Sequence, residues 1–366
     1  MTVSQPHTLQ VAHSATPVMT DKELSDVLFV DLSHELRTPL TAIQGALELL
    51  GSGKLGTLSE QERRMVEIAA SNANRLLRLT AAIEGELESQ VSFLSADEMA
   101  RLRLERDLEM ALEQKEFKLH YQPIISLESS SIVGFEALLR WQHPYLGLIP
   151  PDEFIPLAEA SGSIIEIGAW VLWEACRQLR SWQQRFPEAF RSLTVSVNLS
   201  SKQLALPDLV EHIGQVLQET GLSSQSLVLE ITESAVVENS KTAKQALERI
   251  QNLGVRVYID DFGTGYSSLS RLYELPLDVL KIDRSFVQQL NSQSGEHLVR
   301  AIVNLAHNLG MEVIAEGVEM VEQVMKLRLL GCNRVQGYFF AKPLSQDDLA
   351  ELVCELPSNT LWQPVS

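Results

Sequence analysis

Residues 260–269 set both the expected fold and the expected chemistry of this chain, and they read DDFGTGYSSL. An apolar run at 255–259 precedes them and predicts a buried strand. Asp260 and Asp261 stand where that strand ends, and a strand end can turn both carboxylates towards one site. Like charges this close repel unless a cation lies between them. The stretch therefore predicts a metal-binding loop, in which Gly263 and Gly265 allow close approach to a ligand, or else a solvated turn with an aspartate helix cap.

Composition limits the classes of protein to which the chain can belong. Its 366 residues predict one to three domains, and 45% hydrophobic against 21% charged residues is typical of a globular protein. A net charge of −18 argues against a binder of nucleic-acid polymers, which needs a basic surface. No apolar run approaches the roughly 18 residues of a membrane span, and no signal peptide is seen. Cys176, Cys332 and Cys354 lack metal-binding spacing, so we expect free thiols in the cytoplasm.

The N-terminal part of the chain differs in pattern from the rest. Apolar residues at helical spacing over 22–50 and 59–88 predict a helical hairpin. Two such helices cannot bury their apolar stripes alone, so we expect a four-helix bundle formed with a second copy, and hence a homodimer. The expected segments are a disordered tail at 1–20, the all-α hairpin at 21–90, a helical linker at 91–103, a barrel domain at 104–356 and a C-terminal tail at 357–366.

From Phe117 onwards, apolar β-type runs alternate with stretches long enough for helices. Eight such runs predict an α/β fold, a modified (β/α)8 TIM-like barrel. Only SLESSS, at 126–131, separates the first two runs. Because a parallel crossover needs a dozen or more residues, we expect one antiparallel strand there. The predicted strands are 118–124, 132–138, 194–198, 227–231, 255–260, 279–282, 312–315 and 334–338.

Polar side chains stand at or near the C-terminal ends of seven of these runs, the edge where barrel enzymes build their sites. Carboxylates with an amide oxygen are hard ligands that suit Mg²⁺ or Mn²⁺. Two such ions about 4 Å apart are the arrangement used for phosphodiester hydrolysis. The residues are Glu136, Asn198, Glu230, Asp260, Asp261, Lys281, Glu316 and Gln336.

An ordered series of motifs over about residues 104–350 resembles the EAL family of cyclic di-GMP phosphodiesterases. The resemblance implies metal-dependent hydrolysis of cyclic di-GMP to linear pGpG in bacterial second-messenger signalling. The motifs are YQPI at 121–124, FEALLRW at 135–141 with the EAL signature at 136–138, EFIPLAE at 153–159, VNLS at 197–200, LEITE at 229–233, DDFGTGYSSL at 260–269, LKID at 280–283, AEGVE at 315–319 and QGYFFAKP at 336–343.

The resemblance also implies roles for individual residues. Metal ligands are implied at Glu136, Asn198, Glu230, Asp260, Asp261 and Glu316. Catalytic roles are implied for Lys281, which orients the attacking water or stabilises its charge, and for Gln336, which lies by that water and the metal site. They are also implied for Glu316, a metal-site carboxylate, and for Glu233, which braces the DDFGTGYSS loop. Substrate contacts are implied at Gln122, Leu138, Arg140, Asp283 and Glu319.

Two of these residue roles have alternatives, and so does the function. Lys281 can instead form an ion pair with Asp278 or Asp283, and Glu233 can be a helix cap. A non-catalytic cyclic di-GMP receptor is the alternative function, and such a protein would lack metal ligands that this chain retains.

A second resemblance concerns the hairpin. SHELRTPLTAI at 33–43 resembles the H-box of the dimerisation and phosphoacceptor (HisKA) domain of sensor histidine kinases. In that family the histidine matching His34 is phosphorylated, and the acid matching Glu35 assists proton transfer. Nothing downstream resembles the ATP-binding domain, so phosphate would come from a separate histidine kinase or response regulator. The alternatives are a hairpin that only dimerises, and a phosphorelay or interaction protein with the barrel as output scaffold.

Overall fold

The computed structural model describes residues 41–47, 50, 65–66, 68–74, 76, 96–233, 235, 240–263 and 269–355. The chain divides into two compact units, Met1–Leu102 and Arg103–Ser366. In the first unit, residues 41–47 and 68–74 are helical, as the hairpin prediction requires. His34 and the two predicted tails lie outside the described residues. The predicted domain boundaries stay predictions.

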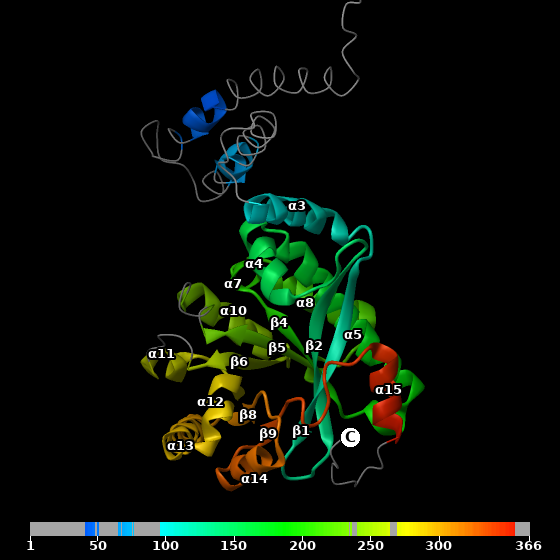
Figure 1. The fold of residues 1–366 in the computed structure, drawn as a ribbon, viewed down its shortest axis with the longest axis vertical. Helices are drawn as coiled ribbons and strands as arrows, with labels where there is room; N and C mark the ends of the chain where they lie inside the picture. Colours follow the sequence, from blue (N-terminus) through cyan, green and yellow to red (C-terminus); the bar gives the residue numbers. More distant parts are fainter. Residues whose placement is uncertain are drawn as a thin grey trace, which may run out of the picture. The chain divides into compact units, whose positions relative to one another are not determined.

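The second unit is a barrel closed by eight strands (Figure 1). The strands follow the order β1-β9-β8-β7-β6-β5-β4-β2, β1 pairs with β2 to close the ring, and β3 is added to the outer edge of β2. This confirms the predicted modified barrel. The strands are β1 Phe117–Ser126, β2 Ile132–His143, β3 Gly147–Ile149, β4 Thr194–Leu199, β5 Leu227–Thr232, β6 Arg256–Phe262, β7 Val279–Ile282, β8 Glu312–Ala315 and β9 Arg334–Val335.

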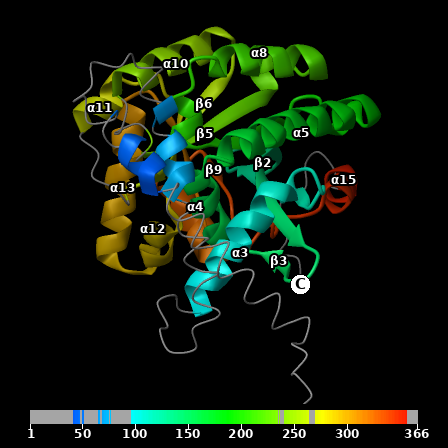
Figure 2. The ribbon, with the colours of Figure 1, turned by 90° about the horizontal axis from the view of Figure 1, so that it is seen from above.

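Helices surround the strands (Figures 1 and 2). The longest, α5, has apolar residues at helical spacing and buries them against the sheet. The helices and 3₁₀ turns are α3 Ala96–Ala111, α4 Pro151–Ser161, α5 Ile164–Arg185, α6 Pro187–Phe190, α7 Ser201–Leu204, α8 Leu209–Thr220, η1 Ser224–Ser226, α10 Ser240–Asn252, α11 Leu269–Glu274, α12 Arg284–Gln288, η2 Gln289–Asn291, α13 Gln293–Asn308, α14 Val321–Leu329 and α15 Gln346–Glu355. Within the described part of the chain, no helix is both long and apolar enough to cross a membrane.

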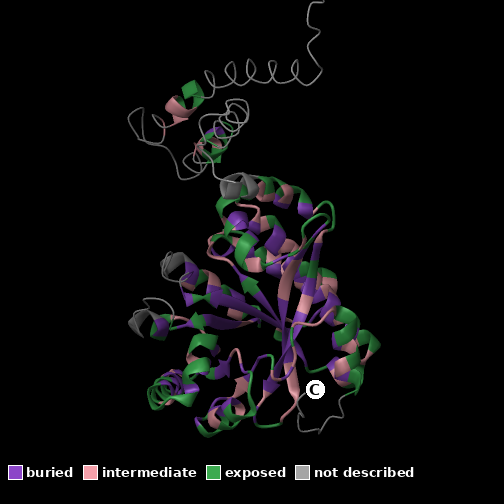
Figure 3. Ribbon diagram, in the orientation of Figure 1, coloured by how far each residue is buried: buried purple, intermediate pink, exposed green. Residues whose placement is uncertain are grey.

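Most residues of the barrel strands are buried, as Figure 3 shows. Parallel strands covered by helices have no face in water, which explains their nearly continuous apolar runs. One interior layer of the barrel consists of Ile124, Val228, Tyr258, Val279 and Ile314, all buried. Polar groups are therefore concentrated at the ends of the barrel.

The predicted antiparallel strand is β1, which runs antiparallel to both β2 and β9. Its register places Gln122 opposite Glu136, so the two side chains share a face. β2 continues to His143, five residues beyond the predicted end, because its last residues pair with the unpredicted strand β3. Buried Trp141 anchors this extension by donating a hydrogen bond from Nε1 to Glu116 Oε2 at 2.8 Å.

The last strand is shorter than predicted and ends at Val335. Gln336 still donates its backbone N–H to Ala315 at 2.9 Å, but Val318 then donates to the Gln336 carbonyl at 3.1 Å. Gly337 packs against this segment so closely that a Cβ would lie 2.1 Å from the Val318 carbonyl oxygen. The chain therefore leaves the sheet to cover the segment that follows β8.

Candidate metal centre

Four carboxylates converge on the ammonium of Lys281, which is buried at the carboxyl end of β7. Lys281 Nζ lies 2.6 Å from Glu230 Oε2 and 2.6 Å from Glu316 Oε1. It also lies 3.1 Å from Asp260 Oδ2 and 3.6 Å from Glu136 Oε2. These contacts come from β2, β5, β6 and the residue after β8, so barrel closure brings them together. Lys281 does not pair with Asp278 or Asp283, and that alternative is wrong.

The two adjacent aspartates reach this centre because β6 carries a bulge. The pairing of β6 with β7 shifts register between Ile259 and Phe262, so one extra residue is accommodated there. Asp261 has a φ of 55°, in the left-handed region that aspartate tolerates better than most residues. Its backbone N–H donates to Asp260 Oδ1 at 2.9 Å. The bulge thus turns both side chains to the same end of the barrel.

Amide side chains hold Glu136 in place. Asn198 Nδ2 donates to Glu136 Oε1 at 2.8 Å, and Gln336 Nε2 donates to Glu136 Oε2 at 2.7 Å. Gln336 Nε2 also lies 3.0 Å from Gln122 Oε1. Gln122 in turn donates from Nε2 to the carbonyl of Ala341 at 3.0 Å. Side chains from β1, from β4 and from the residue after β9 therefore together fix the orientation of one carboxylate.

Burial, together with neighbouring carboxylates, raises the pKa of three acidic side chains at this centre. Burial raises the pKa of Glu230 to about 8, with Glu136 and Asp260 adding to the effect against the opposing influence of Lys281. Burial also raises the pKa of Glu316 well above its usual value, and that of Asp261 to about 6.

Two groups at the centre are stabilised in their charged forms. Burial alone would lower the pKa of Lys281, but the four carboxylates raise it well above its usual value. Burial would raise the pKa of Glu136, but Lys281 and the hydrogen bonds from Asn198 and Gln336 lower it.

The donor set fits divalent cations. Two groups each offer one ligand atom per residue within 4.8 Å of one another: Glu136 with Glu230 and Asp260, and Asp260 with Asp261 and Glu316. Asp260 belongs to both groups, and sharing of one carboxylate is compatible with a pair of cations. Glu230 Oε1 and Gln336 Oε1 are buried without a hydrogen-bond partner among the described residues. An acceptor in that state is costly unless an ion or a water satisfies it.

Glu233 contacts the loop that follows β6. Its Oε2 accepts a hydrogen bond from the backbone N–H of Gly263 at 2.9 Å, and the side chain is buried. Gly263 has a φ of 97°, and a Cβ there would lie 2.7 Å from the Phe286 ring, so glycine is required. This contact favours the bracing role over a helix cap. Residues 264–268 lie outside the described residues.

The substrate contacts expected from the resemblance are spread around the centre. Glu136, Leu138 and Arg140 alternate along β2 and so share one face, with Arg140 beyond the part of β2 that pairs with β4. Burial lowers the pKa of Arg140, while Tyr338 and Glu136 act in the opposite direction.

The other two expected contacts differ in their surroundings. Asp283 caps α12 by accepting from the Ser285 N–H at 3.0 Å, and its charge acts on Asp261. Glu319 is exposed, and its backbone N–H donates to Gln323 Oε1 at 2.8 Å. The structure therefore places Glu319 outside the hydrogen-bond network around Glu136.

Sequence reasoning missed Tyr338. It is 59% exposed, and it acts to raise the pKa of Arg140, the guanidinium expected to contact substrate, against the larger effect of burial. An aromatic residue within QGYFFAKP was the available signal, because an exposed aromatic beside an arginine is suited to stack on a base.

Comparison with known proteins decides the family. Residues 105–343 match the EAL domain family. The chain belongs to the EAL domain family. Residues 27–84 also match the His Kinase A (phospho-acceptor) domain, in agreement with the H-box resemblance.

Curated EAL relatives are much longer than this chain. It is 42% identical over 259 residues to the bifunctional diguanylate cyclase/cyclic di-GMP phosphodiesterase MucR of Pseudomonas aeruginosa, covering 70% of this chain and 37% of MucR. It is 37% identical over 340 residues to the cyclic di-GMP phosphodiesterase NbdA of the same organism, covering 92% of this chain and 42% of NbdA. The chain thus spans about two fifths of the length of these relatives.

Solved EAL structures share the barrel. The phosphodiesterase PaMucR in complex with c-di-GMP superposes with a TM-score of 0.65 and 42% identity, over 68% of this chain and 100% of that one. The EAL domain of FimX from Pseudomonas aeruginosa bound to c-di-GMP superposes with a TM-score of 0.61 and 30% identity, over 66% of this chain and 96% of that one.

Proposed function

We propose that this chain hydrolyses cyclic di-GMP to linear pGpG at the carboxyl end of its barrel, with two Mg²⁺ or Mn²⁺ ions. The observation that carries the proposal is the convergence of Glu230, Glu316, Asp260 and Glu136 on Lys281, with Asp260 in both candidate ligand groups. The names of the relatives MucR and NbdA support the substrate. The proposed ligands are Glu136, Asn198, Glu230, Asp260, Asp261 and Glu316.

Bound cations would lower the pKa of a water molecule and neutralise charge that develops on the phosphate. The side chains of the protein orient the reaction. Arg140 presents a guanidinium suited to a phosphate oxygen, while Gln122 supplies an amide and Leu138 an apolar contact. Asp283 and Glu319 complete the proposed substrate contacts.

Lys281 and Gln336 act on the attacking water in this proposal. The ammonium of Lys281 stabilises negative charge on the attacking oxygen while it holds Glu230 and Glu316 in place. Water oxygen bonds to phosphorus, the bond from phosphorus to the 3′-oxygen breaks, and that oxygen leaves with a proton. Glu233 contributes by fixing Gly263 and thereby the loop beside the centre.

A product assay tests the proposal. Purified full-length protein is incubated with cyclic di-GMP and Mg²⁺, and the nucleotides are separated by chromatography. We expect pGpG from the native protein, none from Glu136→Gln, and retained nucleotide binding by that variant. Binding without turnover by the native protein would instead support a non-catalytic receptor. Hydrolysis by Glu136→Gln at the native rate would remove Glu136 from the metal centre.

We further propose that the HisKA-like hairpin forms a homodimer and that His34 receives phosphate from a separate histidine kinase or response regulator. Four apolar residues of the first unit support the dimer, because they are 49–66% exposed in the single chain: Ile43, Met65, Ile68 and Leu76. Phosphate on His34 would add about −1.5 to −2 charges to the hairpin, by analogy with other phosphorylated side chains. Free cysteines support a cytoplasmic location.

Light scattering on full-length protein and on a variant that lacks residues 1–90 tests the dimer. We expect twice the monomer mass for the full chain and a folded, monomeric barrel for the variant. Equal association states would refute dimerisation through the hairpin. Phosphotransfer to His34, with His34→Ala as control, separates a regulatory input from a hairpin that only dimerises.

A further inference from the structure

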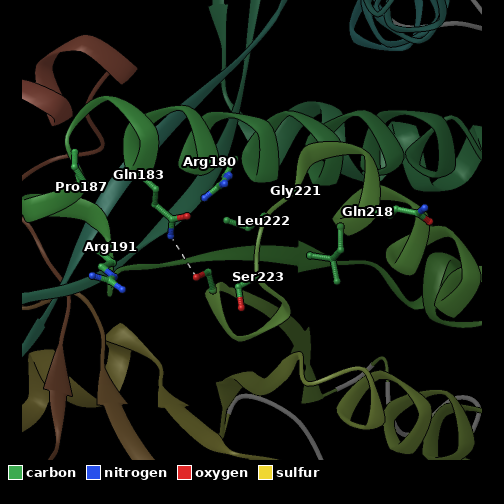
Figure 4. Close-up of a pocket in the computed structure, with 10 residues that line it drawn as sticks. Arg180, Gln183, Pro187, Arg191, Gln218, Gly221, Leu222 and Ser223 are labelled. Atoms are coloured by element: carbon green, nitrogen blue, oxygen red, sulfur yellow. Dashed lines mark hydrogen bonds between the residues drawn. The ribbon is translucent and has the colours of Figure 1, made fainter.

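A second concave site lies at the opposite end of the barrel from the metal centre. It has a volume of about 600 Å³. Figure 4 shows the residues that line it. Arg191 precedes the first residue of β4 by three positions, and Ser226 directly precedes β5, whereas Asn198 and Glu230 stand near the other ends of these strands. The lining residues are Arg180, Gln183, Pro187, Arg191, Leu217, Gln218, Gly221, Leu222, Ser223 and Ser226.

This pocket is lined by positive charge, whereas the chain as a whole is negative. The protein has 48 acidic against 30 basic side chains, yet the ten lining residues include two arginines and no carboxylate. An acidic chain that lines a concavity with arginines alone concentrates positive potential there. Anions are therefore the ligands that the pocket attracts.

Neither guanidinium is neutralised by the protein. Arg180 Nε is buried without a hydrogen-bond partner, and neither Arg180 nor Arg191 has an ion-pair partner among the described residues. Other arginines of the barrel do have such partners, for instance Arg177 with Glu174 at 2.7 Å and Arg300 with Glu296 at 2.8 Å. Arg191 is exposed and Arg180 is only partly buried, so an oxyanion in the pocket can accept hydrogen bonds from guanidinium N–H groups that no carboxylate of the protein occupies.

The remaining lining residues add hydrogen-bonding groups and an apolar wall. Gln183 extends from α5 towards Ser226 and donates from Nε2 to its Oγ at 3.3 Å (Figure 4). Ser223 is exposed, so its hydroxyl is available to a ligand. Leu217 and Leu222 supply apolar surface beside these groups. Such a combination of a few polar groups with apolar surface is typical of small-molecule sites.

We propose that this pocket is a binding site for a small organic anion whose phosphate or carboxylate is held by Arg180 and Arg191. Guanidinium groups bind both kinds of oxyanion through paired N–H donors. The metal centre does not take the same ligands when metal-free, because four carboxylates surround a single ammonium there and Asp261 adds a fifth acidic side chain beside them. The inference is independent of the proposed function, and its failure would leave that proposal intact.

Calorimetric titration of the full-length, metal-free protein at constant ionic strength tests the site. Inorganic pyrophosphate probes phosphate recognition and citrate probes carboxylate recognition. We expect saturable binding of at least one probe, and the tighter probe identifies the oxyanion. Arg180→Gln and Arg191→Gln should each weaken binding about tenfold or more, because each removes a charged hydrogen-bonding group. Arg106→Gln removes an exposed arginine of α3 and should leave the affinity within about twofold.

A second pair of variants keeps the test decisive if an arginine variant fails to fold. Ser223→Glu places a carboxylate at the exposed rim and should abolish binding, whereas Ser223→Ala should retain it. No saturable binding of either probe to the native protein would overturn the proposal. Binding that Arg180→Gln, Arg191→Gln and Ser223→Glu all leave unchanged would also overturn it.

Discussion

Replacement of Lys281 by methionine removes the positive charge around which the metal centre is built. Lys281 Nζ makes two contacts of 2.6 Å, one of 3.1 Å and one of 3.6 Å with carboxylate oxygens. At an effective dielectric constant of about 20, each 2.6 Å contact represents roughly 6 kcal/mol of gross attraction. Desolvation of the buried ions and repulsion among the carboxylates offset most of this sum.

The net loss of stability in Lys281→Met comes from carboxylates that stay buried without a counter-charge. Loss of one partner of a buried ion pair costs about 3–5 kcal/mol, and we expect Lys281→Met to lower the free energy of unfolding of the metal-free barrel by that amount. The loss should shrink as pH falls from about 8 to about 5. The pKa values of Glu230 and Glu316 are already raised by burial, and without the Lys281 charge they rise further above their unfolded values, so the folded variant takes up protons and regains stability at low pH.

Urea denaturation followed by tryptophan fluorescence measures this effect, because Trp141 and Trp182 are buried in the barrel. Lys118→Met is the matched control, since Lys118 is an exposed lysine of β1 and should change the unfolding free energy by less than about 1 kcal/mol. Added Mg²⁺ should restore part of the lost stability. A loss in Lys281→Met no larger than in the control, or one that is the same at both pH values, would refute the electrostatic reasoning.

Three further predictions follow from individual contacts. Glu233→Ala removes the acceptor of the Gly263 N–H and should lower the free energy of unfolding by about 1–3 kcal/mol, with a proportionally larger loss of turnover. Glu233→Gln keeps an oxygen acceptor and should retain more of both stability and turnover. Equal turnover in the native protein and both variants would contradict the bracing role. Burial raises the pKa of Glu230 to about 8 and that of Asp261 to about 6, so the folded metal-free protein keeps protons that the unfolded chain has released. The contribution of these two groups to the free energy of unfolding should therefore fall as pH rises from about 4 to 8. Metal must displace those protons, so the rise in melting temperature at a fixed Mg²⁺ concentration should grow over about pH 6 to 8, and a constant rise would contradict it. Burial raises the pKa of both the Cys176 and Cys332 thiols to about 12, whereas Cys354 is exposed. A thiol reagent should therefore modify Cys354 alone in the folded protein and all three cysteines after denaturation. Rapid modification of the folded Cys354→Ser variant would contradict this order.

Much of the barrel was predictable because its signals are local. Apolar runs bounded by polar residues predict strands, and the six-residue link at 126–131 rules out a parallel crossover before β2. β3 was missed because a three-residue strand carries little periodicity, and it forms only because the end of β2 offers a partner edge. The extension of β2 to His143 depends on the same pairing.

Residue order alone sets which polar side chains stand near the strand ends, and a local pattern is enough to recognise them. Tertiary structure decided what they do together. The bulge that turns Asp261 beside Asp260 depends on the register between β6 and β7. Barrel closure places Lys281 among carboxylates from three other strands and from the residue after β8. The proposed anion site is a stronger case, because Arg180, Arg191 and Ser223 belong to no common motif and line one pocket only when α5 packs against α6 and α8. Non-local contacts of this kind are set by packing across the whole fold, which a local pattern does not encode.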